Sequence, residues 1–275
     1  MNLESFLQDA LTVALGAARS SAALIRQYYR GEFSVELKPD QTPVTVADRE
    51  AEDMIRNILM SAFPDHGFYG EEGGRSGSDA EFLWLVDPID GTKSFVAGYG
   101  MFSTQIALLH RGDLVLGVSS APAYDELAWA CTGRGAQVQG TPARVRDTRS
   151  LQQAAISTGN IQSLAASKRW NALGRILAAA NRTRGYGDYY HYHRLAAGQI
   201  DAVIESDVNI LDIAALVVIV REAGGVFTDL EGNPPGLATT SVLAAPPRLH
   251  AQLLDMLNSN LLNSGSGSTQ GQPHD

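Results

Sequence analysis

The sequence predicts a layered fold of mixed helices and strands, of the α/β or α+β class. Short apolar runs bounded by turn residues crowd the first half of the chain, whereas helical and strand patterns alternate in the second half. The chain has 275 residues, of which 44% are hydrophobic, so it can bury a large core in one domain or in two closely packed lobes. The sequence shows no internal repeat.

The first half is expected to begin with a long helix. Apolar residues recur at helical spacing from Leu3 to Ala14, which predicts an amphipathic helix over residues 3–30. A loop over residues 38–47 follows, and then a second helix that carries Asp48 near its start and runs to about Phe63. Strands are predicted next at residues 82–86, 102–109, 114–119, about 127–131 and 136–138.

The second half is expected to alternate between the two kinds of element. Strands are predicted near residues 155–158, 201–205, 226–228 and 241–244. Helices are predicted at residues 163–180, 187–198, 212–223 and 247–258. Residues 263–275 are poor in apolar side chains and rich in Ser and Gly, so they are predicted to form a disordered tail.

Residues 84–95 form the most informative run, Trp-Leu-Val-Asp-Pro-Ile-Asp-Gly-Thr-Lys-Ser-Phe. An apolar stretch followed by Pro88 and Gly91 predicts a buried strand that stops at a sharp turn, where Asp87 and Asp90 converge. Two carboxylates held that close repel each other unless a cation lies between them, and oxygen ligands suit Mg²⁺. An Asp-x-x-Asp pair can also simply cap a turn, so the pair alone leaves both interpretations open.

The whole run resembles the metal-binding signature of the inositol monophosphatase-like family of Mg²⁺-dependent phosphatases. Four further segments match the pattern of that family in the same order, namely Pro43–Asp48, Tyr69–Glu72, Leu211–Ala215 and Glu222–Gly225. Leu211 departs from the pattern, because a tryptophan is usual there, and we expect this change to alter packing behind Asp212 rather than ligation.

The resemblance implies a fold and a domain organisation. The family fold is an αβαβα sandwich, and the order of predicted elements agrees with it. We therefore expect a single phosphatase domain over residues 1–262. It would consist of a metal-binding lobe over about residues 1–150 and a substrate-side lobe over about residues 151–262.

The resemblance also implies a role for each acid. Asp87 would bridge two Mg²⁺ ions, with Glu71 and the carbonyl of Ile89 completing one site and Asp90 and Asp212 completing the second. A third, weaker ion would lie near Glu71. Metal coordination supplies hydroxide near neutral pH, and the water would attack phosphorus directly, without a phosphoenzyme.

Two further roles follow from the same resemblance. Catalysis would depend on Asp48, Thr92 and Glu71, of which Thr92 and Asp48, with Thr45 behind them, orient or deprotonate the attacking water. Asp90 and the backbone N–H groups of Gly91 and Thr92 would lie at the phosphate.

Most of these residues also have a structural interpretation. Glu71 could lie in a solvated acidic loop, and Thr92 could be an ordinary turn residue. Asp48 and Asp212 could each be the N-cap of a helix, a role that is compatible with metal binding.

Substrate choice is expected to depend on the later half of the chain. Asp188 follows Gly187 where inositol phosphatases usually carry small uncharged residues, and this resembles the histidinol-phosphate phosphatase branch. Histidinol phosphate carries an ammonium and an imidazole, with which Asp188 and Glu205 could pair, and Lys93 could touch the phosphate. Asp188 could equally cap the helix that follows. Inositol monophosphatase or 3′-phosphonucleotide phosphatase is the alternative activity.

Two histidines invite a metal-site interpretation that their spacing argues against. His191 and His193 lie two residues apart on a predicted helix, so they point in different directions. We expect them to be surface residues or, at most, neighbours of the substrate. The Arg134 segment is common to the family and is expected to be structural.

Composition excludes several classes of protein. The net charge of −9 argues against nucleic acid as a partner, because binding its backbone needs a basic surface. The sequence has no Gly-x-Ser-x-Gly elbow and no Walker loop, which disfavours a serine hydrolase and a P-loop kinase. No apolar run is long enough to span a membrane.

Composition also suggests a location. Cys131 is the only cysteine and is expected to be buried, so we expect a reducing compartment. Glu4 and Asp9 stand where a signal peptide would be basic, which favours the cytoplasm. A small phosphorylated metabolite is the expected partner, and the family resemblance implies a homodimer.

Overall fold

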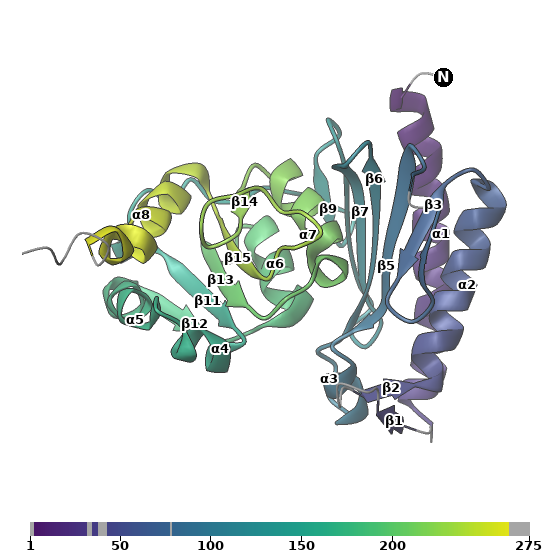
Figure 1. Ribbon diagram of the computed structural model, residues 1–275, viewed down its shortest axis with the longest axis horizontal. Coiled ribbons are helices and arrows are strands. Elements are labelled where there is room, and N and C mark those ends of the chain that lie inside the picture. The colour runs from purple at the N-terminus through teal and green to yellow at the C-terminus, as the bar shows by residue number, and fades with distance from the viewer. Residues whose placement is uncertain (1–2, 32–34, 38–42, 78, 264–275) are drawn as a thin grey trace, which may run out of the picture.

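Two large β-sheets, with helices between them and outside them, make up the molecule (Figure 1). The computed structural model describes residues 3–31, 35–37, 43–77 and 79–263. The predicted tail from residue 264 onward and the part of the predicted loop at residues 38–42 lie outside the described residues.

The first half of the chain forms an eight-stranded sheet. Its strands are β3 (Gly67–Gly70), β4 (Gly74–Ser76), β5 (Phe82–Asp90), β6 (Ser103–His110), β7 (Asp113–Ala121), β8 (Glu126–Cys131), β9 (Ala136–Val138) and β10 (Thr141–Ala143). Their order is β10-β9-β8-β7-β6-β5-β3-β4, and all neighbours are antiparallel except the parallel pair β3 and β5. Both faces of this sheet are covered, which explains why the first eight of the nine residues of β5 are buried.

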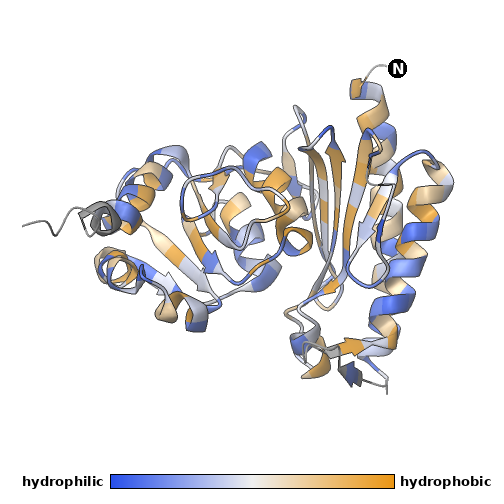
Figure 2. Ribbon diagram, in the orientation of Figure 1, coloured by the Kyte–Doolittle hydropathy of each residue, from blue (hydrophilic) through white to orange (hydrophobic). Residues whose placement is uncertain are grey.

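Two long helices, α1 (Leu3–Tyr29) and α2 (Val46–Ala62), cover the outer face of this sheet (Figure 1). Each buries one apolar stripe and leaves polar side chains outside, as the hydrophilic outer side of α2 shows in Figure 2. Near the N-terminal end of α2 lie the short helix α3 (Thr92–Val96) and an antiparallel pair of strands, β1 (Val35–Leu37) and β2 (Pro43–Thr45).

The second half forms a five-stranded sheet. Its strands are β11 (Ala155–Gly159), β12 (Arg182–Arg184), β13 (Ala202–Ser206), β14 (Val226–Thr228) and β15 (Ser241–Ala245), in the order β12-β11-β13-β15-β14. Strand β11 is parallel to β12 and β13, and the other neighbours are antiparallel. The outer helices are α4 (Ile161–Ala166), α5 (Trp170–Ala179) and α8 (Pro247–Asn263), with a short 3₁₀ helix η1 at Leu151–Gln153.

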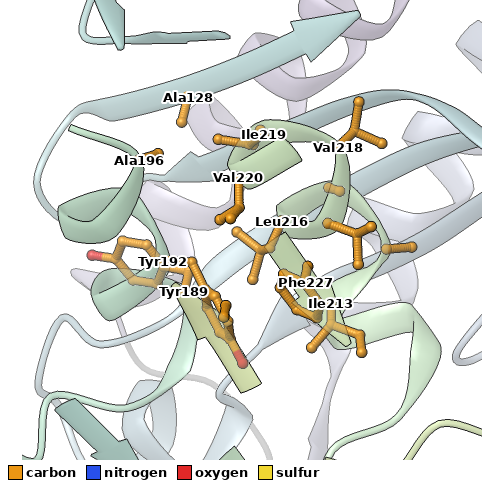
Figure 3. Close-up of a cluster of buried hydrophobic side chains, with 14 of the residues drawn as sticks. Ala128, Tyr189, Tyr192, Ala196, Ile213, Leu216, Val218, Ile219, Val220 and Phe227 are labelled. Carbon is orange, nitrogen blue, oxygen red and sulfur yellow. The ribbon is translucent and has the colours of Figure 1, made fainter. Parts of the chain in front are cut away.

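Between the two sheets lie helices α6 (Asp188–Ala196) and α7 (Ile210–Glu222) (Figure 1). Helix α7 is apolar almost all round, as a helix buried on every side must be, and ten of its residues are buried. Figure 3 shows part of the resulting core, where Tyr192 on α6, Leu216 on α7 and Phe227 on β14 gather in one cluster. The rings of Tyr192 and Phe227 stack with centroids 5.5 Å apart.

The predicted αβαβα sandwich is confirmed. The layers run from α1 and α2 through the eight-stranded sheet, then α6 and α7, then the five-stranded sheet, to α4, α5 and α8 (Figure 1). None of the helices among the described residues is both long and apolar enough to cross a membrane.

Some boundaries differ from the prediction. The helix predicted at residues 163–180 is two helices, because α4 ends at Ser167, whose hydroxyl accepts a hydrogen bond from the backbone N–H of Arg169 at 3.2 Å. The predicted loop at 38–47 contains β2 and the start of α2. The predictions also missed β1, β3, β4, β10 and β12, which have only three or four residues each and so show no measurable alternation.

Candidate active site

The site begins at an irregularity near the end of β5. Asp87 lies opposite Gln105 and Asp90 opposite Ser103, so β5 carries one residue more than β6 across this interval. Side chains three residues apart on a regular strand face opposite sides, and the extra residue turns both carboxylates to the same side. Pro88 fits there because it has no N–H to donate to the ladder. The strand was predicted to end at residue 86. It continues instead to Asp90.

Three carboxylates meet at this point. Asp87, Asp90 and Asp212 each offer an oxygen within 4.8 Å of the others. Burial raises the pKa of Asp87 and of Asp90 well above the usual range, and the negative charge of neighbouring acids, above all Glu71 for Asp87 and Asp212 for Asp90, raises it further. Burial likewise raises the pKa of Asp212 to about 7. Such a set is stable in its charged form only with a cation.

Asp48 reaches the site from the first turn of α2. Thr45 is the N-cap of this helix, and its N–H and Oγ1 donate to Asp48 Oδ2 at 2.7 and 2.6 Å. The hydroxyl of Thr92 lies 3.2 Å from Asp48 Oδ1 and 3.0 Å from the carbonyl oxygen of Ile89, which places it between the two. Asp48 is thus the N3 residue of a capping box rather than the cap itself. Burial raises its pKa.

Asp212 has the matching position on α7. Asn209 is the N-cap, and its side-chain amide and backbone N–H donate to Asp212 Oδ1 at 2.6 Å and Oδ2 at 2.8 Å. Asp212 is therefore also not the N-cap that one interpretation expected. Leu211, which stands in place of the family tryptophan, is buried in the core behind it.

Two predicted residues lie around the cluster rather than within it. Glu71 is exposed at the rim, after β3, and its negative charge still raises the pKa of Asp87, Asp212 and Asp48. Gly91 has φ +85°, and a Cβ there would lie 2.6 Å from the carbonyl oxygen of Met101, so only glycine fits this turn.

The acids open onto a cavity of about 650 Å³. The predicted residues that line it are Glu71, Asp87, Ile89, Asp90, Gly91, Thr92, Lys93, Asp188 and Asp212. Asn160 and Asp207 line it as well, and the sequence analysis missed both. A signal existed, because each follows the end of a strand (β11 and β13), where ligands of α/β sheets bind.

Three further residues that line the cavity have an unusual backbone conformation. Asn160, Asp188 and Asp207 have φ of 48°, 47° and 59°, the left-handed region that side chains other than glycine rarely occupy. Strain of this kind concentrates at functional sites, since the surrounding structure must hold it. Asp188 is the first residue of α6, whose N-cap is Gly187, so Asp188 does not act as the cap that one interpretation expected.

The two substrate-side acids differ in their surroundings. Burial, followed by the charge of Glu205, raises the pKa of Asp188 to about 6. Glu205 reaches an inner pocket of about 40 Å³ that Asp90, Asp188 and Asp212 also line. Its Oε2 accepts a hydrogen bond from the hydroxyl of Tyr192 at 2.5 Å and lies 3.1 Å from His191 Nε2.

The prediction that His191 and His193 lie on the surface is wrong. Both are fully buried, because α6 lies between the sheets and has no solvent-facing side at these positions. They do point apart, as the helical spacing predicted: His191 faces Glu205, and His193 faces Glu126 and Ser119. Arg134 contacts Gln8 and Glu4 of α1, which agrees with a structural role.

Comparison with known proteins agrees with this geometry. The model of the inositol monophosphatase family matches residues 7–262. The chain belongs to the inositol monophosphatase family.

Individual relatives cover nearly the whole chain. A histidinol-phosphatase of Streptomyces coelicolor is 35% identical over 93% of this chain and 99% of its own length. A histidinol-phosphatase of Mycobacterium tuberculosis is 37% identical over 91% of this chain and 98% of its own. The crystal structure of the extragenic suppressor protein suhB from Bartonella henselae has a TM-score of 0.83, with 32% identity over 90% of this chain and 98% of that protein.

Inositol monophosphatase family members are phosphatases that generally depend on Mg²⁺, and the residues present fit such an ion. All donors at the cluster are carboxylate oxygens, the ligands that a hard cation prefers. Burial and the repulsion between acids raise the pKa values of Asp87, Asp90 and Asp212, and a bound cation would offset both effects. The family member described here therefore carries an acidic cluster suited to a divalent cation.

Proposed function

We propose that this phosphatase hydrolyses histidinol phosphate to histidinol and phosphate. The observation that carries the proposal is a second group of acids, here called the acidic wall, formed by Asp188, Asp207 and Glu205. These acids line the inner pocket together with Asp90 and Asp212, and Asp188 and Asp207 also line the larger cavity. A neutral polyol can only donate hydroxyl hydrogen bonds to these acids, whereas the ammonium and imidazolium groups of histidinol phosphate can also pair with their negative charge. The names of the two histidinol-phosphatases support the same substrate.

We assign the metal ligands as the sequence predicted. Asp87, Asp90, Asp212, Glu71 and the carbonyl oxygen of Ile89 would hold two to three Mg²⁺ ions. Bound Mg²⁺ supplies hydroxide near neutral pH and neutralises the phosphate.

The residues of the chain position the water. The Thr92 hydroxyl has one hydrogen and two acceptors within reach, Asp48 Oδ1 and the carbonyl of Ile89. When it donates to Asp48, its lone pair faces the cavity and can accept a hydrogen bond from the attacking water. Asp48, which accepts two hydrogen bonds from Thr45, then takes up the proton of the Thr92 hydroxyl as Thr92 takes one from the water.

Phosphate would lie at the start of α3. The backbone N–H groups of Gly91 and Thr92 and the side chain of Lys93 border the cavity beside Asp90. Backbone N–H groups at such a turn bind phosphate oxygens without a side-chain charge, so they compensate for the excess of acids nearby. We assign phosphate contact to Asp90, Gly91 and Thr92, with Lys93 at the substrate.

We also propose a domain organisation, an oligomeric state and a location for the whole protein. We propose one catalytic domain over residues 1–262, since α7, which carries Asp212, packs against β7 and also contributes to a core with β14 and β15. We also propose a homodimer located in the cytoplasm, on the family resemblance, and size-exclusion chromatography with light scattering tests the dimer.

Steady-state phosphate release tests the substrate. The panel is histidinol phosphate, inositol monophosphate, 3′-phosphoadenosine 5′-phosphate and fructose bisphosphate, each with Mg²⁺ and with EDTA. We expect kcat/KM for histidinol phosphate to exceed the others at least about tenfold, because charge-assisted bonds contribute about 1.5–3 kcal/mol each. A preference for inositol monophosphate or the nucleotide would be consistent with the proposed phosphatase reaction but would contradict histidinol phosphate as the substrate.

Variants of the acidic wall sharpen this test. Asp188→Asn and Asp207→Asn should each raise KM for histidinol phosphate about tenfold while leaving KM for inositol monophosphate near its parental value. Asp113→Asn, which changes an exposed acid at the start of β7, is the matched control. Equal losses on both substrates would show that the wall does not recognise a cation.

A further inference from the structure

A chain of buried hydrogen bonds leads away from Asp90 through the sheet to α6. Ser103 Oγ donates to Asp90 Oδ2 at 3.2 Å. Gln105 Nε2 donates to Ser103 Oγ at 2.7 Å and to Ser119 Oγ at 3.0 Å. Ser119 Oγ lies 2.8 Å from His193 Nε2, and His193 Nδ1 lies 2.7 Å from Glu126 Oε1, which Arg194 also contacts.

The sheet places these side chains in one row. Asp90 is directly opposite Ser103, and Gln105 is directly opposite Ser119, on neighbouring antiparallel strands. Ser103 and Gln105 are two residues apart, so they face the same side of β6. The row thus follows the register from β5 to β7 and ends on the helix that covers this face.

The direction of every bond follows from the Gln105 amide nitrogen facing the two serines. A Gln105 amide nitrogen only donates, so both serine oxygens accept from it, and each serine hydrogen is left for its other neighbour. The Ser103 hydrogen therefore points at Asp90, as an ionised carboxylate requires. Burial lowers the pKa of His193, which makes it neutral, with its hydrogen on Nδ1 facing Glu126 and Nε2 accepting from Ser119.

Packing alone does not explain this row. Ser103, Ser119 and His193 are completely buried, and Gln105 is 1% exposed. Gln105 Oε1 has no hydrogen-bond partner within the described parts of the chain, although it is buried. Turning the amide round would satisfy this oxygen from both serines but would take the Ser103 hydrogen away from Asp90. In the orientation present, Gln105 Nε2 serves both serines, and the Ser103 hydrogen is left for Asp90.

We propose that Ser103, Gln105, Ser119 and His193 are positioning residues that tie the metal ligand Asp90 to helix α6. The same helix carries Asp188 at its first residue, so the row joins the metal side of the cavity to the acidic wall on the substrate side. Partners behind a ligand typically change metal affinity by about 10–100-fold when they are removed. The inference rests on the proposed role of Asp90 in binding the metal.

Ser119→Ala and Ser120→Ala form a matched test. The two hydroxyls are neighbours on β7, but Ser120 lies opposite Thr104 and so points to the other face of the sheet, away from the row. Affinity for Mn²⁺ alone, measured on the full chain by the EPR signal of the free ion, does not depend on turnover. We expect Ser119→Ala and Gln105→Met to weaken Mn²⁺ binding about tenfold, and Ser120→Ala to leave it unchanged. Gln105→Asn, which keeps an amide donor, should recover part of the affinity.

The outcomes separate this inference from the proposed function. Unchanged Mn²⁺ affinity in Ser119→Ala, or an equal loss in Ser120→Ala, would overturn the positioning role. Failure to hydrolyse histidinol phosphate would contradict the proposed substrate. A difference in Mn²⁺ affinity between the two serine variants would still support the positioning role of the row. The KM for histidinol phosphate gives a second readout. Ser119→Ala should raise it more than Ser120→Ala does, because the row ends on the helix that carries Asp188.

Discussion

At the scale of single residues, the cluster holds more negative charge than a buried site tolerates. Asp90→Asn should abolish Mg²⁺-dependent phosphate release, because it removes a proposed metal ligand. It should also raise the free energy of unfolding in EDTA by about 1–3 kcal/mol, because a buried charge that faces Asp212 is lost. Urea unfolding in EDTA measures the gain, and the exposed Asp113→Asn should change neither quantity. Parental turnover in Asp90→Asn would show that the metal assignment is wrong.

The raised pKa values also predict how stability depends on pH. Well below about pH 4 the carboxyls of Asp87, Asp90 and Asp212 are protonated in both the folded and the unfolded chain. As pH rises further, the unfolded chain releases protons that folded Asp212, with its pKa of about 7, still holds, so unfolding becomes easier until about pH 7. In EDTA the Tm should therefore fall over this window, and Mg²⁺ should raise the Tm more at about pH 8 than at about pH 5.

The control for this prediction is Asp212→Asn, which should flatten the decline in EDTA. A decline of equal size in parent and variant would assign the pH dependence to other groups.

The residues that the sequence predicted are those with a local signal. Asp87 and Asp90 stand in one short motif, and each other acid stands in a motif of its own. The buried roles of His191 and His193 were not predictable, because their partners Glu205 and Ser119 lie 14 and 74 residues away. Nothing local to a helix indicates which of its faces a distant strand will cover.

At the scale of elements, α2 and α7 bring acids to the site in the same way. Each helix begins with a capping box whose N3 residue, Asp48 or Asp212, lies at the site. Asn209→Ala should lower the free energy of unfolding by about 1 kcal/mol through loss of the cap. It should also weaken Mg²⁺ binding about tenfold, because Asp212 loses the amide that orients it. Urea unfolding and calorimetric Mg²⁺ titration measure the two effects.

Asn209→Ser separates the two roles of this side chain. Serine keeps an acceptor for the N–H of Leu211 but has no amide to hold Asp212. We expect parental stability with weakened Mg²⁺ binding. Parental affinity in both variants would show that the cap does not orient the ligand.

The elements that were predicted correctly include the long periodic ones, such as α1, and two short strands, β9 and β14. Those that were missed or misplaced depend on contacts that a local pattern does not contain. Strand β5 continues past Pro88 because β6 pairs with it on both sides of the extra residue, and this pairing is visible only in the sheet. The functional consequence is direct, since the same irregularity turns Asp87 and Asp90 to one side.

At the scale of the whole molecule, the site exists only where the two halves meet. The eight-stranded sheet supplies Asp87 and Asp90, the loops after β11 and β13 supply Asn160 and Asp207, and α7 carries Asp212 between them. The layer order was predictable from the resemblance, whereas the distance between layers depends on packing that the sequence does not display. Gly117 sets that distance, because α7 lies directly on β7 at this residue.

Gly117→Ala tests whether this close approach maintains the site. A Cβ at residue 117 would lie 2.3 Å from the carbonyl oxygen of Ala215 and 2.8 Å from its Cα, and backbone cannot move aside as a side chain can. We expect α7 to shift away from the sheet, with a loss of about 2–3 kcal/mol in the free energy of unfolding and weaker Mg²⁺ binding, because Asp212 moves with the helix. Gly16→Ala on α1, where no atom lies within 4 Å, should instead stabilise the protein by about 0.5–1 kcal/mol and leave Mg²⁺ binding unchanged. Parental Mg²⁺ affinity in a folded but destabilised Gly117→Ala protein would show that the three carboxylates keep their arrangement independently of the distance between the layers.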